Sequence, residues 1–144
     1  MRTEIDRIAI VRRREVRRLC SGRIKVLHPE LQHISPNDYA SWEAFAAAEH
    51  PEPWDEFAWF VLSIGLEGQE GSTLFQVLVT TPAAVARAKG NDKQRRFLVV
   101  ESFEPELLAK SLREYVSSVA CHTWDEIVER LRAHMYWEYE KRWS

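Results

Sequence analysis

The chain has 144 residues, of which 45% are hydrophobic and 29% are charged, and its formal net charge is −2. A chain of this length forms one domain with a substantial core, and its mixture of apolar and charged residues excludes the disordered and fibrous classes. No apolar run approaches the roughly 18 residues that a membrane-spanning helix requires, which argues against a membrane protein.

The charges are sorted along the chain. Residues 1–25 carry nine lysines and arginines and three acidic residues, a net charge of +6, so the remaining residues carry −8. After Lys25 the next lysine or arginine is Arg87, and nine carboxylates lie between them. Such an acidic body repels nucleic acid and anionic membranes and attracts a basic protein.

Residues 1–22 form an arginine-rich arm whose apolar residues recur at irregular helical spacing. Two interpretations stay open for the arm: a basic tail that contacts nucleic acid, and a poorly ordered leader. Arginines interrupt each of its apolar runs, so no secretory signal is predicted and the cytoplasm is the expected location. Cys20 and Cys121 are isolated and lack metal-ligand spacing, so both are expected to be reduced thiols.

Residues 23–144 are expected to form a single domain that begins with a strand over residues 23–31. A loop-rich segment follows at residues 35–56. Its stretch SWEAFAAAE, residues 41–49, predicts a short helix that the next prolines end. Residues 38–56, which combine carboxylates with tryptophans, are called the acidic segment below.

Two strands that flank a glycine-rich turn are expected next. EFAWFVLSIG, residues 56–65, is apolar on both alternating faces, which is typical of a central strand covered on both sides. TLFQVLVTT, residues 73–81, is expected to return as its neighbour. The glycines between them supply the positive φ that a turn requires, so the pattern predicts a long hairpin.

The C-terminal half alternates short and long elements. A short helix is expected over residues 82–88, and RRFLVVES, residues 95–102, is expected to be a third core strand. Pro105 suits the first position of a longer helix. Thr123 and Glu126 have the spacing of a capping box, which predicts the start of the last helix.

The last helix is expected to present one apolar stripe to the core. At about 100° per residue, the stripe consists of Trp124, Val128, Leu131, Met135 and Tyr139. Trp137 lies opposite this stripe. Its side chain is expected either to be buried by another element or to be displayed to a partner, and burial is favoured. The predicted fold class is α+β: a mostly antiparallel sheet of three to four strands with two C-terminal helices packed on one face.

Motifs for catalysis are missing from the sequence, which has no nucleophile elbow, zinc-protease motif, phosphate loop or dinucleotide fingerprint. The five histidines are scattered, so no metal site is predicted. Cys121, His122 and Asp125 are the residue types of a thiol catalyst, but adjacent side chains on one short loop rarely reach the required geometry. We therefore expect no catalysis and no cofactor.

The acidic segment is the best candidate for a binding surface. Carboxylates raise the rate at which a basic partner is encountered, and aromatic side chains supply most of the affinity. The segment is expected to be irregular, and binding residues often lie on such segments. The candidate partner-binding residues are Asp38, Glu43, Glu52, Trp54, Asp55 and Glu56.

Two alternatives to this interpretation remain. The segment could be a solvated acidic loop whose tryptophans point inward. The protein could also be an enzyme or a small-ligand-binding protein with a pocket beneath residues 35–56.

Five stretches, taken in order over residues 24–140, are similar to the bacterial immunity protein 8 family. The closing tryptophan-acid-aromatic-acid sequence is the most specific of them. The stretches are VLHPELQHISPNDYASW, FVLSIGLEGQEGSTLFQVLVTTP, RRFLVVESFEPELLAKSLREYV, TWDEIVERL and WEYE.

The resemblance implies a protein that binds and blocks a cognate toxin domain from a contact-dependent or secreted bacterial competition system. It implies neither catalysis nor a cofactor, and it leaves the oligomeric state open. The arm of residues 1–22 departs from the family. The family-like positions, which the resemblance implies to be mostly fold determinants, are Gly65, Thr81, Pro82, Trp124, Trp137, Glu138, Tyr139 and Glu140.

A further hypothesis concerns the toxin. Many toxin domains are nucleases with basic substrate clefts, and a carboxylate-rich inhibitor could occupy such a cleft in place of phosphate.

Overall fold

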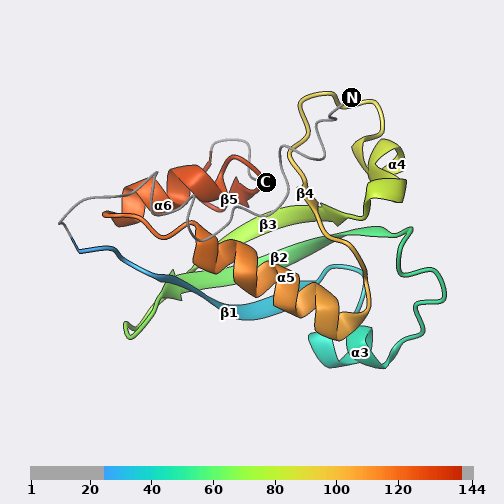
Figure 1. Ribbon diagram of the computed structural model, residues 1–144, viewed down its shortest axis with the longest axis horizontal. Helices are drawn as coiled ribbons and strands as arrows, with labels where there is room; N and C mark the ends of the chain where they lie inside the picture. The colour runs from blue at the N-terminus through green and yellow to red at the C-terminus, as the bar shows by residue number, and fades with distance from the viewer. Residues whose placement is uncertain (1–24, 141–144) are drawn as a thin grey trace.

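The computed structural model describes residues 25–140. The expectations for the arm of residues 1–22 therefore lie outside the described residues. Figure 1 shows a sheet with helices around it. In chain order the elements are β1 (Pro29–Pro36), α3 (Trp42–Ala47), β2 (Phe57–Leu66), β3 (Thr73–Thr80), the 3-10 turn η1 (Pro82–Ala84), α4 (Val85–Lys89), β4 (Leu98–Val99), α5 (Pro105–Ser118), α6 (Trp124–Leu131) and β5 (Tyr136–Trp137).

The sheet has the order β1-β2-β3-β4, and β5 also pairs with β3. β1 and β3 both run antiparallel to β2, which confirms the predicted hairpin of β2 and β3. β4 is parallel to the end of β3, and β5 is antiparallel to its start. The expected α+β class with a mostly antiparallel sheet is confirmed.

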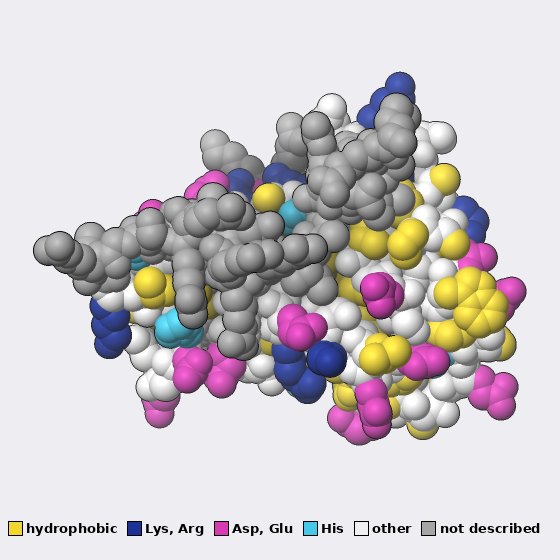
Figure 2. Space-filling view, viewed as in Figure 1, with side chains coloured by type: hydrophobic (Ala, Val, Ile, Leu, Met, Phe, Trp, Pro, Cys, Tyr) yellow, Lys and Arg dark blue, Asp and Glu magenta, His cyan; other side chains and the backbone are white. Residues whose placement is uncertain are grey.

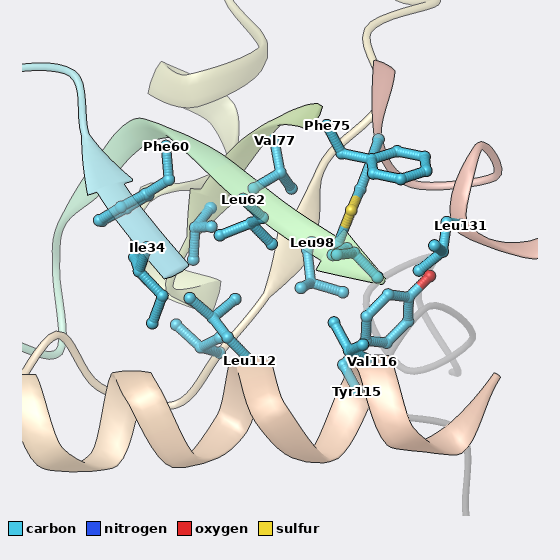
Figure 3. Close-up of a cluster of buried hydrophobic side chains, with 14 of the residues drawn as sticks. Ile34, Phe60, Leu62, Phe75, Val77, Leu98, Leu112, Tyr115, Val116 and Leu131 are labelled. Atoms are coloured by element: carbon cyan, nitrogen blue, oxygen red, sulfur yellow. The ribbon is translucent and has the colours of Figure 1, made fainter. Parts of the chain in front are cut away.

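The main core lies between one face of the sheet and helices α5 and α6. In Figure 1, α5 crosses in front of β1 and β2. Figure 3 shows side chains from the strands and from α5 pointing toward one another, and each large apolar side chain so buried contributes about 1.5–3 kcal/mol. The labelled residues are Ile34, Phe60, Leu62, Phe75, Val77, Leu98, Leu112, Tyr115, Val116 and Leu131.

The opposite face of the sheet is covered in part. Leu78, Phe97 and Val99 form a second buried cluster there, and Trp59 packs against it. Phe57, at the start of the same strand, keeps 38% of its surface exposed. The expectation that β2 is covered on both faces therefore holds at the middle of the strand, at Trp59, and is wrong at its first residue, Phe57.

Two strand boundaries differ from those predicted. The first strand begins at Pro29 and runs to Pro36, beyond the predicted range, because β2 supplies antiparallel partners for it out to Phe60. The third core strand, predicted over residues 95–102, covers only Leu98–Val99. The reason is that only the last two residues of β3, Val79 and Thr80, pair with it in parallel.

The last helix also ends earlier than predicted. Its capping box is present: Glu126 N donates to Thr123 Oγ1 at 3.2 Å, and Thr123 N donates to Glu126 Oε1 at 3.1 Å. The helix stops at Leu131, and the chain then turns so that Trp137 pairs with Phe75 of β3. Tertiary pairing has overridden the helical periodicity, so the predicted place of Tyr139 on the buried stripe is wrong, and its side chain is 70% exposed.

Cys121 is buried at the turn between α5 and α6 and is disulfide-bonded. The expectation of a reduced thiol at this position is therefore wrong, while Cys20 lies outside the described residues. None of the helices among residues 25–140 combines the length and the apolar character that crossing a bilayer requires.

Candidate protein-binding surface

Helix α3 anchors the acidic segment to the core. Ser41 caps the helix by accepting a hydrogen bond from Ala44 N at 3.0 Å. Phe45 is 1% exposed, and its ring lies 5.1 Å from that of Trp42 and 5.7 Å from that of Phe60. Trp42 is half-buried against the core. The inward-pointing alternative is thus correct for this tryptophan.

His50 closes the loop that follows α3. Its Nε2 lies 3.0 Å from the carbonyl oxygen of Phe45, and its Nδ1 lies 3.1 Å from the carboxylate of Glu56. The imidazole therefore ties both ends of residues 45–56 together, and the carboxylate of Glu56 faces it rather than open solvent.

Two further anchors hold this loop. Phe103 N donates to the carbonyl oxygen of Pro53 at 2.8 Å. The hydroxyl of Thr81 accepts from Glu56 N at 3.1 Å and donates to the carbonyl oxygen of Glu56 at 3.2 Å. A segment without regular structure is therefore held in one conformation, which lowers the entropy lost when it binds a partner.

Within this frame the candidate contact residues separate into two groups. Asp38, Glu43 and Glu52 are exposed, and Trp54 keeps 59% of its surface exposed. Asp55 and Glu56 are half-buried and already paired. Arg87 Nη1 donates to Asp55 Oδ1 at 2.8 Å, and the guanidinium of Arg87 also lies over the ring of Phe57. The five carboxylates among the six candidates are therefore not equally free to bind a partner, since two of them already have one.

A second acidic stretch lies beside the first, and the sequence interpretation missed it. The hydrogen bond from Phe103 to Pro53 brings the start of α5 next to the loop. Acidic residues at the start of a helix are expected from the helix dipole alone, so they gave no separate signal. The exposed residues of this stretch are Glu101, Glu104, Glu106 and Leu107.

We call these two stretches together the acidic surface. Figure 2 shows acidic and hydrophobic side chains gathered at the end of the molecule that carries α3 and the start of α5. Pulling the two stretches together concentrates negative charge around two exposed apolar side chains, Trp54 and Leu107. Its exposed members are Asp38, Glu43, Glu49, Glu52, Trp54, Glu101, Glu104, Glu106 and Leu107.

The family-like residues at the C-terminal end make a separate network at β3. Glu138 Oε2 accepts from Thr73 Oγ1 at 2.6 Å and from Leu74 N at 2.5 Å. The indole Nε1 of Trp137 donates to Thr73 Oγ1 at 3.0 Å, and Trp137 is half-buried against the core. These contacts fasten β5 to the edge of β3.

Glu140 lies next to this network, with only 7% of its side chain exposed. It accepts hydrogen bonds from Arg96 Nη1 at 2.8 Å, Arg132 Nη2 at 2.9 Å and Trp137 N at 2.6 Å. Burial alone would raise the pKa of Glu140, but these donors together hold it below its usual value. The same pairing raises the pKa of Arg132.

Two other titratable groups are buried near α6. His134 Nδ1 lies 3.2 Å from the carbonyl oxygen of Phe97, and burial lowers the pKa of His134 despite that contact. Burial raises the pKa of Tyr115, whose ring meets that of His134 edge-on at 5.6 Å. Both shifts favour the neutral side chains, as the apolar surroundings require.

The alternative of a pocket beneath residues 35–56 gains little from the structure. The underside of the segment is filled by the rings of Tyr39, Trp42 and Phe45. A hollow beside Trp42 and Glu43 has a volume of about 130 Å³, below the roughly 300 Å³ of small ligand sites. Among residues 25–140, no three histidine, cysteine, aspartate or glutamate side chains are grouped so that they could hold a metal ion.

Comparison with known proteins identifies the family. The model of the family described as immunity protein 8 matches residues 30–142, which is most of the chain. The chain belongs to the immunity protein 8 family. Neither the curated proteins nor the solved structures gave a match. The match of this immunity protein begins within β1 and includes both the acidic surface and the C-terminal network.

Proposed function

We propose that this immunity protein binds a cognate toxin domain and neutralises it stoichiometrically, without catalysis. Membership of the family supports the class of partner. The acidic surface supports the mode of action, because carboxylates around exposed apolar anchors suit a basic protein domain.

One observation carries the proposed contact surface. Trp54 is 59% exposed although the loop around it is anchored through Pro53 and Glu56. A large aromatic side chain displayed on an ordered loop is the kind of residue that dominates binding energy at interfaces. Asp38, Glu43 and Glu52 would attract the partner, whereas Asp55 and Glu56 would contribute less because they are already paired.

The proposed target is a nuclease with a basic substrate cleft. The acidic surface would then occupy the place of the nucleic acid phosphates. In this case the protein and a nucleic acid substrate compete for the toxin, and saturating substrate slows association. A toxin domain with an acidic surface, or one that forms pores, would refute the nuclease hypothesis.

Trp54 provides the direct test. The toxin domain encoded beside the gene should be expressed in sensitive cells with and without this protein, and growth should be restored only with it. Trp54→Ala should weaken toxin binding at least 10-fold by calorimetry, since truncated interface anchors commonly cost 2 kcal/mol or more, as an order of magnitude. Leu74→Ala, which removes a 41%-exposed side chain from β3, is the matched control and should leave the affinity unchanged.

The possible results separate the two parts of the proposal. Failure to restore growth would refute the proposed function. Restored growth with an unchanged affinity for the Trp54→Ala protein would refute the contact surface alone.

A further inference from the structure

A second hollow lies at the opposite end of β2 from the acidic surface. It has a volume of about 450 Å³, and its lining includes Trp124, Tyr139, Glu70, Gly65 and Gly71. Since Glu56 precedes the first residue of β2 and the β2–β3 turn follows its last, about 30 Å of strand separates the two places. The hollow is therefore distinct from the acidic surface.

Two aromatic side chains form walls of the hollow. Trp124 is half-buried and packs against the core, so its position is fixed. Tyr139 is 70% exposed, and its ring meets that of Trp137 edge-on at 5.1 Å. Both of its chain neighbours, Glu138 and Glu140, are fixed by hydrogen bonds. The structure thus displays Tyr139 in a defined place without burying it.

Two glycines line the hollow where the β2–β3 turn approaches the end of β2. A Cβ atom on Gly65 would lie 2.4 Å from the carbonyl oxygen of Gly71, so a side chain cannot be accommodated there without a backbone shift. Gly71 has φ +94°, a conformation that other residues rarely adopt. The place of a side chain at Gly65 is thus filled by the backbone of Gly71, whereas no atom lies within 4 Å of where a Cβ atom on Gly71 would be, so the hollow is open beside Gly71.

The electrostatic character of the hollow favours a cation. Glu70 contributes an exposed carboxylate, and none of the described residues that line the hollow is a lysine or an arginine. The positive end of α6 lies at Trp124, but the carboxylate of Glu126 caps it through Thr123 N. Aromatic faces beside a carboxylate attract ammonium and guanidinium groups.

We propose that this hollow binds the side chain of an arginine or lysine presented by the toxin domain, as a second contact separate from the acidic surface. The source of the cation rests on the proposed function, whereas the chemistry of the hollow does not. A guanidinium group would lie against the rings of Trp124 and Tyr139 and pair with Glu70.

The test uses the isolated full-length protein and two small probes. N-acetyl-arginine amide and its uncharged isostere N-acetyl-citrulline amide should be titrated while the NMR signals of the Trp124 indole and the Gly71 amide are followed. N-acetyl-arginine amide, called arginine amide below, should give saturable shifts of both signals. N-acetyl-citrulline amide should give none. The proposal is overturned by the absence of shifts, by equal shifts with both probes, or by shifts confined to other residues.

Paired variants locate the binding groups. Glu70→Gln should weaken arginine amide binding roughly two- to five-fold, as loss of an exposed ionic contact does, whereas Glu67→Gln on the same turn should not. Tyr139→Phe should retain binding, and Tyr139→Leu should lose it. Equal affinities for the Glu70→Gln and Glu67→Gln proteins would overturn the assignment, and an unchanged thermal midpoint establishes that each variant is folded.

These outcomes are independent of those for the proposed function. Restored growth in the presence of toxin, together with no binding of arginine amide, would overturn the cation site alone. Specific binding of arginine amide without protection from toxin would overturn the proposed function and leave the site in place.

Discussion

Glu140 illustrates how a single carboxylate can fix a C-terminal segment. Its two oxygens receive the guanidinium groups of Arg96 and Arg132 and the backbone N–H of Trp137. Arg96 Nη1 also donates to the carbonyl oxygen of Met135, so the segment before β5 is held as well. Removing this carboxylate would leave two arginine side chains without their shared partner.

This arrangement predicts a defined dependence of stability on pH. Because the pKa of Glu140 is lower in the folded protein than its usual 4.5, its contribution is fully present above about pH 4.5 and is lost as the pH falls through the folded-state pKa. Glu140→Gln should lower the free energy of unfolding by about 2 kcal/mol at pH 7. The difference from the native protein should shrink below pH 4.5, which urea unfolding at a series of pH values would measure.

Glu129→Gln is the matched control for this prediction. Glu129 also pairs with Arg132, at 2.7 Å, but its side chain is 69% exposed, so its contribution should be small throughout. A constant difference between the native and Glu140→Gln proteins from pH 7 to pH 3 would contradict the prediction.

At the scale of elements, the acidic segment depends on its attachment to the end of β3. The hydroxyl of Thr81 is both acceptor and donor to the backbone of Glu56, and Thr81 is fully buried. Thr81→Val preserves the shape of the side chain and removes both hydrogen bonds. We expect faster hydrogen exchange at the Glu56 amide and a loss of stability of about 1–2 kcal/mol.

Thr80 provides a neighbouring control. Its hydroxyl donates to the carbonyl oxygen of Thr81 at 2.9 Å and is likewise buried, but it makes no hydrogen bond to the acidic segment. Thr80→Val should therefore lower stability without changing exchange at the Glu56 amide. If both variants accelerated that exchange equally, the specific role given to Thr81 would be wrong.

The elements that were predicted well have local causes. The hairpin of β2 and β3 follows from apolar strands around glycines, and the start of α6 follows from Thr123 and Glu126. The end of α6 was not predictable in this way. It depends on the antiparallel pairing of Trp137 with Phe75, a residue more than 60 positions earlier in the chain.

The candidate site shows the same limit. Its charge and its aromatic character were evident from the sequence, but the pairing of Asp55 with Arg87 depends on how α4 packs. The contribution of Glu101, Glu104 and Glu106 depends on the contact between Phe103 and Pro53. Contacts and ion pairs between residues that are distant in the chain leave no local pattern in the sequence from which they could be predicted.

At the scale of the whole molecule, the separation of charge should govern how fast the toxin is captured. Reversing one carboxylate from each stretch of the acidic surface, with Glu52→Lys and Glu104→Lys, should slow association with a basic toxin about 10-fold at low salt. Raising the ionic strength should slow the native protein markedly and the double variant less, because screening acts on the attraction that the variant lacks. Stopped-flow measurements at several salt concentrations would test this.

The control for the charge reversal is Glu114→Lys. Glu114 is exposed on α5 but lies two turns beyond Glu106, and its reversal should have a smaller effect on the rate. If Glu114→Lys slowed association as much per reversed charge as the Glu52→Lys, Glu104→Lys double variant does, the toxin would be attracted by the net charge of the protein and not by the acidic surface.

The arrangement around β3 has a consequence for how the protein is made. One edge of this strand is covered by β4 and β5, and both of these are synthesised after it. Until residue 137 has emerged from the ribosome, the start of β3 lacks its β5 neighbour, so the nascent chain exposes unpaired backbone groups along that edge.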